Sequence, residues 1–453
     1  MGGAVKELPH SAKWRIVSER FVGTYTDPAD LSEAEQRARA EHATVLLHVH
    51  ANIFVYACCF WMQQPILPSL TKALGVDSVV FGTLSSVINV FALVGGPLVG
   101  RIVDTSGPKT GLIISQGGSF LMYALMACAY TLPILFLSRV PAIAQHAMLC
   151  AQAVVSKITL PQNRASALGR LSLSYAIGMV LGSPVGGTIS KNYGDHMTCL
   201  SASVLSLLMI VTNYVYLPSL TTSTTTDSQA DSAAEECKAK PKKSALDVTE
   251  IVEVLRVQKV FLLVTFSFLV GLGMNMYTSM FSLIMTDSIH MDSQSLGMLM
   301  AYAGVLSVVA NVGVVGALSG SLGDFKTMVV ASFLLAVGIP SICVYSTDLV
   351  SVLVLTTPTS ISSTIIYTVL GALISGSVHQ DQTGTAISLS HAVRSLCGII
   401  SPIVGGYILR EFDVPTLGIV AGALIGSACA CLWLMGRDML DSVTAPTSGK
   451  KST

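Results

Sequence analysis

The chain has 453 residues, of which 51% are hydrophobic and only 11% are charged. Soluble domains carry about 25% charged residues, so this composition excludes a soluble globular fold. The length and the mean hydropathy of +0.66 leave room for about a dozen helical membrane crossings of roughly 20 residues each. The apolar runs are too long for barrel strands of about 10 alternating residues. We therefore expect an all-α polytopic membrane protein.

Several other function classes lack the residues that they need. The formal net charge is zero and gives no indication of a nucleic-acid partner, and we expect none. Most of the ten cysteines lie inside apolar runs without metal-ligand spacing, so we assign them to packing and expect no metal and no cofactor. A phosphate-binding Gly-x-x-x-x-Gly-Lys-Ser/Thr loop and a catalytic cluster are both missing from the sequence, which argues against an ATP-driven pump and against an enzyme.

The chain divides into two sets of six apolar runs. Residues 1–44 are polar and predict a cytoplasmic N-terminal segment. Six runs follow, at about 45–70, 78–103, 109–130, 131–156, 165–190 and 197–217. Residues 218–257 are rich in Ser, Thr and Lys and predict a disordered cytoplasmic tether. Six more runs lie at about 258–286, 294–320, 325–346, 349–378, 384–409 and 414–436, before a polar tail at 437–453. We expect two six-helix bundles, 45–217 and 258–436.

The basic residues predict the orientation. If both termini lie on one side, that side carries 21 of the 26 Lys and Arg residues. The other side holds only Lys72, Lys191 and Arg410, and two arginines fall inside spans. Because Lys and Arg concentrate in cytoplasmic loops, both termini and the tether are predicted to be cytoplasmic.

The two halves resemble each other in sequence. Residues 167–187 and 386–406 both begin with Ala, contain a Ser-Pro pair and end in Gly-Gly, at a shift of 219 positions. Duplicated six-helix units in the same orientation imply a pseudo-two-fold axis along the membrane normal.

A polar segment between the second and third spans carries a recognisable motif. It matches four positions of the signature Gly-x-x-x-Asp-Arg-x-Gly-Arg-Lys, namely Gly100, Asp104, Gly107 and Lys109. The second half keeps the glycine frame at 316–328, a shift of 216. The chain therefore resembles the major facilitator superfamily, which implies a conformational latch at this loop. An ordinary polar turn is the alternative.

Span five carries a second motif of this superfamily. Its proton-coupled antiporters have Gly-x-x-x-Gly-Pro-x-x-Gly-Gly here, and this chain departs from it by having Ser183 followed by Pro184. The resemblance implies hinge or packing roles, in the two halves, for Gly178, Gly182, Pro184, Gly186, Gly187, Pro402, Gly405 and Gly406. Close helix packing without any role in coupling is the alternative.

Longer segments are similar to the organic cation transporter-like carriers of solute carrier family 22. These segments include LGVDSVVFG and FLSRVPAIAQHAM, and the similarity is sharpest in residues 74–187. It implies a polyspecific carrier that exchanges organic cations and xenobiotics for protons. The expected partners are a small organic solute, protons and the lipid bilayer. We expect a monomer in the plasma membrane, with an intracellular membrane as the alternative.

Charged side chains within a span are costly and suggest function. Arg139 in span four matches the arginine of the superfamily's Arg-x-x-Gln-Gly motif. On a continuous helix, His146 would lie two turns further along the same face, with Gln145 beside it. We expect these three residues to bind substrate or relay a proton. The alternative is that Arg139 satisfies backbone carbonyls and His146 is a packing residue.

In the second half, His391 and Arg394 are three residues apart in span eleven and are candidates for the same roles. Polar candidates in other spans include Asn89, Asn275 and Tyr277, each of which could instead join helices.

No Asp or Glu lies securely within a span, so the predicted site is positive. Cations would have to be held by aromatic and Met side chains, or the substrate is anionic, zwitterionic or lipid-like. A membrane scaffold or sensor that no longer transports is the rival from another class.

Overall fold

The structure is a computed structural model that describes residues 33–159, 164–217, 255–378 and 383–440. These residues are helical almost throughout, without a β-strand among them. The residues before 33, nearly all of the predicted tether (218–254) and the end of the tail (441–453) lie outside the described residues. The predicted all-α membrane fold is confirmed.

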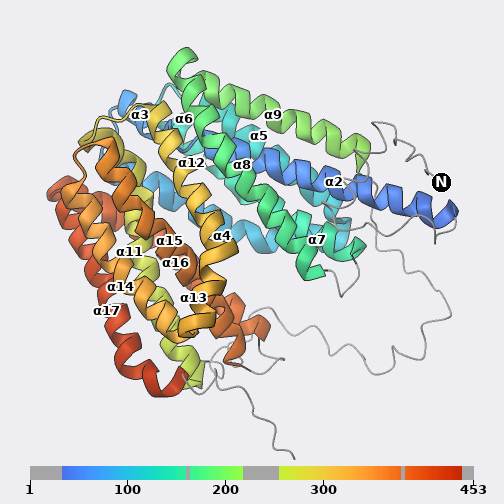
Figure 1. Cartoon of the computed structure of the whole chain (residues 1–453). Coiled ribbons are helices and arrows are strands. Elements are labelled where there is room, and N and C mark those ends of the chain that lie inside the picture. The colour runs from blue at the N-terminus through green and yellow to red at the C-terminus, as the bar shows by residue number, and fades with distance from the viewer. Residues whose placement is uncertain (1–32, 160–163, 218–254, 379–382, 441–453) are drawn as a thin grey trace, which may run out of the picture. The chain divides into compact units, whose positions relative to one another are not determined.

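The helices of the first half follow the six predicted runs (Figure 1). They are α2 (Glu33–Met62), α3 (Leu67–Ala73), α4 (Ser78–Ser106), α5 (Pro108–Ala127), α6 (Leu132–Leu137), η2 (Val140–Ala144), α7 (Ala147–Ile158), α8 (Arg164–Tyr193) and α9 (Asp195–Tyr216). Helix α2 begins well before the apolar run, so the polar residues from Glu33 onward continue into the first span as one helix.

The second half repeats the pattern. Its elements are α11 (Gln258–Ser288), α12 (Ser293–Val309), the π-helical turn η4 (Ala310–Val314), α13 (Val315–Leu322), α14 (Asp324–Tyr345), α15 (Leu349–Gly376), α16 (Thr383–Glu411) and α17 (Val414–Leu440). Eleven segments of the described chain are long and apolar enough to cross a membrane. Helix α8 is not among them, but its 30 residues occupy the place of the predicted fifth span, which agrees with twelve crossings.

The helices pack into two compact units. Among the described residues, unit 1 comprises 33–70, 91–159, 164–217 and 292–301, and unit 2 comprises 71–90, 255–291, 302–378 and 383–440. Within unit 1, α2 packs along α8 and α5 along α9; within unit 2, α17 packs along α14 and α11. The first part of α4 belongs to unit 2, and the first part of α12 belongs to unit 1. The expected bundles, 45–217 and 258–436, therefore stay a prediction.

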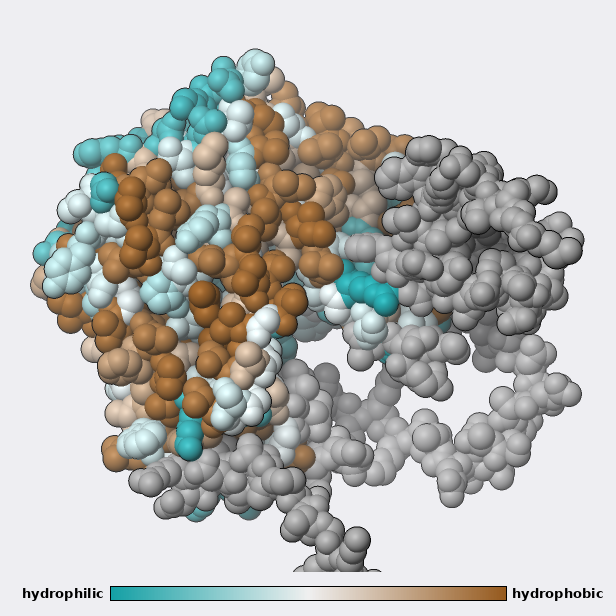
Figure 2. Space-filling model, viewed as in Figure 1, coloured by the Kyte–Doolittle hydropathy of each residue, from teal (hydrophilic) through white to brown (hydrophobic). Residues whose placement is uncertain are grey.

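Apolar side chains cover the sides of the helices. Large residues such as Leu208 and Val211 of α9 and Phe333 and Val337 of α14 are more than half exposed. In Figure 2 brown apolar residues form broad areas on the face in view, and hydrophilic residues gather at its upper edge. Exposed apolar surface of this extent is suited to lipid contact.

The sequence repeat is also a structural repeat at the turn that follows α4. Gly107 (φ 84°) precedes α5, and Gly323 (φ 81°) precedes α14. A positive φ favours glycine because it has no side chain to clash. Of the two glycines in the motif, Gly107 makes the turn between α4 and α5, whereas Gly100 lies inside α4.

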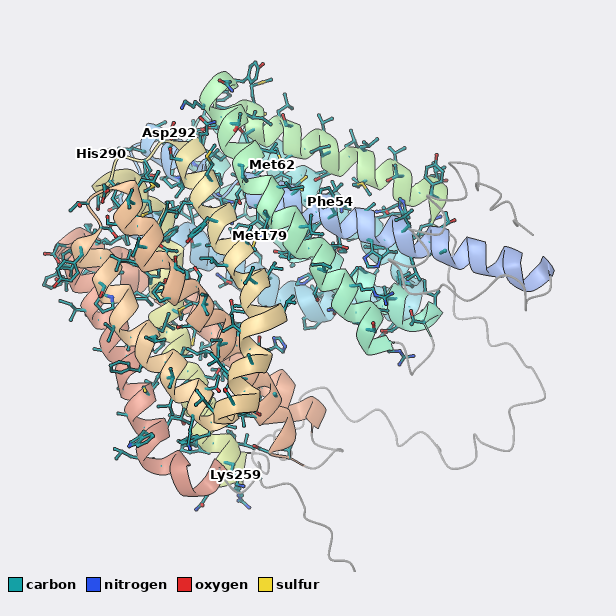
Figure 3. The ribbon with its side chains drawn as sticks, in the orientation of Figure 1. Phe54, Met62, Met179, Lys259, His290 and Asp292 are labelled. Atoms are coloured by element: carbon teal, nitrogen blue, oxygen red, sulfur yellow. The ribbon has the colours of Figure 1, made fainter. Side chains whose placement is uncertain are left out.

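The glycines of span five bring two helices into close contact. A Cβ atom on Gly178, Gly182 or Gly186 would approach backbone atoms of α2 at Phe54, Cys58 or Met62, with shortest distances of 2.5, 2.5 and 2.2 Å. Figure 3 labels Phe54 and Met62 on α2 and Met179 on the adjacent α8. Helix α8 runs through Pro184 without interruption.

The two halves use equivalent residues for a second kind of close contact. In unit 1, Gly187 of α8 meets the Ser293 carbonyl of α12, and a Cβ on it would lie 2.2 Å from that oxygen. In unit 2, Gly406 of α16 meets the Ser78 carbonyl of α4 in the same way, at 2.3 Å. Nearby, Gly82 lies against the backbone carbonyl of Pro402, and Gly405 lies against the side chain of Met276. These glycines have the packing role that the motif implies, whereas the hinge role stays a prediction.

The three basic residues assigned to the outside each form an ion pair. Lys72 pairs with Asp287 at 3.0 Å, Lys191 with Asp292 at 2.9 Å, and Arg410 with Asp77 at 3.6 Å. Their side chains are about half exposed, so each pair contributes little to stability on its own.

Asp292 (labelled in Figure 3) gives these contacts a testable pH dependence. Hydrogen bonds from Ser295, and then Lys191, lower the pKa of its carboxyl to about 2 from 3.8. A lowered pKa stabilises the fold above the unfolded-state value, and this contribution is lost as the pH falls through the folded-state value. Asp292→Asn should therefore lower the melting temperature by a constant amount between pH 5 and pH 7. The difference should shrink between about pH 4 and pH 2; a difference that stays constant over that range would contradict this assignment.

Candidate functional site

Span four is not a continuous helix. Helix α6 ends at Leu137, the 3-10 turn η2 covers Val140–Ala144, and α7 begins at Ala147. Within the break, the Ala142 amide donates to the Arg139 carbonyl and the Gln145 amide donates to the Ala142 carbonyl, at 3.1 Å each. Pro141 stands at the start of this turn and has no N–H to donate. The expectation of one helix over 131–156 is therefore wrong at residues 138–146.

The break separates Arg139 from His146, which a continuous helix would place on one face. Arg139 points into the interior of unit 1, and none of its surface is exposed. Its Nη1 donates to the Met126 sulfur at 3.5 Å, and its guanidinium interacts electrostatically with Cys199 and Tyr123. The predicted stripe formed by Arg139 and His146 is therefore wrong.

The charge of Arg139 is uncompensated within the described residues. Its Nε and Nη2 atoms are buried without a hydrogen-bond partner, as is the hydroxyl of the neighbouring Tyr123. A buried cation without a counter-charge costs several kcal/mol. The burial of Arg139 therefore destabilises the fold, and its role in binding or transport stays a prediction.

Gln145 and His146 lie on the other side of the break. The Gln145 carbonyl accepts a hydrogen bond from the Tyr56 hydroxyl of α2 at 3.1 Å. The His146 amide donates to the Ser115 hydroxyl of α5 at 3.3 Å, and a Cβ on Gly95 of α4 would lie 2.8 Å from its Nε2. Both side chains are half-buried, and the Nε2 atoms of both lack partners among the described residues. Irregular backbone within a span is tolerated where it is buried in protein or lines a water-filled cavity.

Unit 2 holds a second group of candidates. The Arg394 guanidinium of α16 stacks on the Tyr367 ring of α15, with Cζ 4.3 Å from the ring centroid. Both side chains reach the surface: Arg394 is exposed, and 36% of Tyr367 is accessible. His391, three residues before Arg394, is also exposed. Sequence spacing predicted the two α16 residues as neighbours, but it gave no indication of Tyr367.

The other polar candidates mainly contact helix backbones. Asn89 of α4 donates to the Gly398 carbonyl of α16 at 3.0 Å, one turn beyond Arg394. Asn275 donates at 2.8 Å to the Gly271 carbonyl of its own helix. The Tyr277 hydroxyl is buried without a partner in the described part of the chain. Any role of these residues in binding stays a prediction.

In the predicted latch loop, Lys109 contacts a neighbouring helix, and Asp104 does not. Lys109 donates to the Tyr214 carbonyl of α9 at 3.0 Å, and its Nζ lies 5.6 Å from the centre of the Tyr214 ring. Asp104 is exposed and has no hydrogen bond or ion pair with any described residue. The latch function stays a prediction.

A buried polar network in unit 1 was not anticipated from the sequence. Asn52 of α2 donates to the Asn213 side chain of α9 at 2.7 Å and accepts from Gln116 of α5 at 3.0 Å. His48 contacts the same Asn213 oxygen at 2.9 Å. The only indication of this network in the sequence was the presence of isolated Asn and Gln residues within apolar runs. The network joins three helices and needs no ligand to explain it.

Comparison with known proteins agrees with this architecture. The family model of the Major Facilitator Superfamily matches residues 49–335 and again residues 263–452. Human "Solute carrier family 67 member A1" is 30% identical over 415 residues, which are 90% of this chain and 96% of that protein. "Solute carrier family 22 member 18" of Mus musculus is 32% identical over 373 residues, which are 80% of this chain and 88% of that protein.

Solved transporter structures share the fold at low sequence identity. The nucleoside transporter NupG has a TM-score of 0.70 at 14% identity and covers 87% of this chain and 99% of its own. The human organic anion transporter MFSD10 has a TM-score of 0.58 at 16% identity, with 86% and 99% covered. Together, the repeated helices, the two glycine-lined turns and the family match lead to one conclusion: the chain belongs to the Major Facilitator Superfamily.

Proposed function

We propose that this protein is a secondary active transporter that exchanges small organic solutes for protons by alternating access. The observation that carries the proposal is the break in span four, which separates the buried, uncompensated Arg139 from Gln145 and His146, whose buried Nε2 atoms lack hydrogen-bond partners among the described residues. Substrate and ion sites of such carriers are formed where spanning helices are discontinuous. Membership of a superfamily of transporters supports the same function.

Histidine is the best candidate for carrying the proton. In the described spans, Asp and Glu residues lie only near helix ends. His146 at the break in unit 1 and His391 on α16 in unit 2 lie away from those ends and are partly accessible. An imidazole is the side chain whose charge changes most readily near neutral pH. We assign the proton to one of these two residues.

Two observations bear on the charge of the solute, and they favour opposite signs. The resemblance to organic cation transporter-like carriers supports organic cations and xenobiotics as substrates. Arg139 and Arg394, without a carboxylate beside them in the described chain, favour a solute with a negative group. One structural neighbour is itself described as an organic anion transporter. The test must therefore offer both kinds of solute.

The purified protein in liposomes with an imposed pH gradient tests this function. We expect uptake of a labelled organic solute that requires the gradient and persists in His196→Ala. His196 is a control because it lies near the start of α9, where its ring stacks on that of Tyr130 with the centroids 4.5 Å apart. His146→Ala should reduce gradient-driven uptake about 100-fold or more, as expected for loss of a proton-transferring group.

Three other outcomes would be informative. Uptake that ignores the gradient in every variant would keep the carrier and reject proton exchange. Equal uptake by wild type and His146→Ala, with full gradient dependence, would move the proton to His391. An absence of flux for cationic, anionic and neutral solutes would favour a membrane scaffold of the same fold.

A further inference from the structure

We propose that the Arg394–Tyr367 pair is a binding subsite for the anionic group, a carboxylate, sulfonate or phosphate, of the transported solute. This inference rests on the proposed transport function, because it names the solute class for that function. It also makes a claim about binding that can be tested without any flux.

The position of Arg394 requires contact with water or with a ligand. It lies eleven residues after Thr383, where α16 begins, which is roughly 16 Å along the helix axis. A further seventeen residues follow before α16 ends at Glu411. An exposed charge this far from either end is too costly to face lipid. Arg394 therefore faces a hydrated part of the protein.

The contact with Tyr367 fixes the guanidinium and leaves its donors free. The ring covers one face of the guanidinium plane, with Cζ 4.3 Å from the ring centre. Stacking of this kind restrains the side chain but does not use its N–H groups. No hydrogen bond or ion pair occupies those groups in the described part of the chain. A planar fork of free N–H donors fits two oxygens of a carboxylate, sulfonate or phosphate.

The surroundings of Arg394 contain no compensating negative charge among the described residues. His391 lies one turn before it and adds a second positive charge when it is protonated. Cys397, on the following turn, donates to the Phe268 carbonyl of α11 at 3.5 Å. Asn89 donates a hydrogen bond to the carbonyl of Gly398, the residue after Cys397. A cationic solute would be repelled here, whereas an anionic group would gain a charge-assisted bidentate contact.

Matched aromatic probes and variants of one helix test this subsite. The probes are naphthalene-2-sulfonate, its neutral sulfonamide and naphthylmethylammonium, and binding is measured on the purified full chain. The variants are Arg394→Gln, Arg394→Lys and Tyr367→Leu. The control is Arg410→Gln, because Arg410 also lies on α16 and near a tyrosine ring, 5.7 Å from the centre of Tyr407. Melting curves and elution profiles verify that each variant is folded.

We expect the wild type and Arg410→Gln to bind the sulfonate more tightly than the other two probes. Arg394→Gln should weaken sulfonate binding about 10- to 100-fold, as expected for loss of hydrogen bonds to a charged group. Arg394→Lys and Tyr367→Leu should each weaken it several-fold and leave the neutral probe unaffected. No sulfonate binding by the wild type, equal binding by Arg394→Gln, or equal affinity for the neutral probe would overturn the proposal.

Uptake of the same probes separates this inference from the transport function. Gradient-driven uptake of the ammonium probe but not of the sulfonate would keep the carrier and reject the anion subsite. Arg394-dependent binding of the sulfonate without flux of any probe would keep the subsite and reject transport.

Discussion

Alanine in place of Gly182 is expected to destabilise the protein, although alanine is the better helix former. The new Cβ would lie 2.5 Å from the Cys58 carbonyl oxygen and 2.8 Å from the Cys58 Cα of α2. These are backbone atoms of a long helix, so relief requires α2 and α8 to move apart. Overpacking of a filled core costs about 1–3 kcal/mol, which should lower the melting temperature by several degrees. Thermal unfolding of the purified protein in detergent measures this.

Gly169 provides the matched control on the same helix. A Cβ at this position would meet nothing within 4 Å, and Gly169 is exposed. Gly169→Ala should leave the melting temperature unchanged or raise it, because alanine loses less backbone entropy than glycine on folding. An equal rise for Gly182→Ala and Gly169→Ala would show that α2 and α8 are not held at the distance described.

Methionine in place of Arg139 is expected to raise thermal stability and to abolish transport. The guanidinium is fully buried and has two donors without partners in the described part of the chain. Replacing a buried charge by an apolar side chain of similar shape is often neutral or stabilising, by about 1–4 kcal/mol. Methionine also suits the neighbouring Met126, which Arg139 now contacts through sulfur. Melting temperature and solute uptake must be measured on the same preparation.

Two further variants separate the charge of Arg139 from its shape. Arg139→Lys keeps the charge and should keep part of the uptake without the gain in stability. Arg101→Met removes an arginine that is exposed on α4, and it should change the melting temperature little. A lower melting temperature for Arg139→Met together with normal uptake would make Arg139 a structural residue and would remove it from the transport function.

The spans and their repeat could be predicted because they depend on local composition. Apolar runs of membrane length place the helices, and the shifted glycines Gly107 and Gly323 predict equivalent turns, which the structure shows. The spacing of four between Gly178, Gly182 and Gly186 predicted close approach of another helix. It did not identify that helix as α2, because the identity of a partner depends on contacts distant in the sequence.

The break in span four could not be predicted from its proline. Pro184, Pro340, Pro358 and Pro402 all lie inside continuous helices, whereas Pro141 lies in the 3-10 turn. A proline removes one hydrogen bond, and the packing around it decides whether the helix continues. The stacking of Arg394 on Tyr367 could not be predicted either. It joins α15 and α16, and no pattern in the sequence indicated which sides of these two helices face each other.

Exchange of solute across liposomes without any pH gradient tests alternating access most directly. Vesicles containing the purified protein are loaded with unlabelled naphthalene-2-sulfonate and diluted into a trace of labelled naphthalene-2-sulfonate. A carrier whose binding site crosses the membrane faster when it holds solute than when it is empty should concentrate the label transiently inside the vesicles. Arg394→Gln should lose this transient accumulation. Label that enters at the same rate with and without internal solute, or that never enters, would contradict a carrier of organic anions working by alternating access.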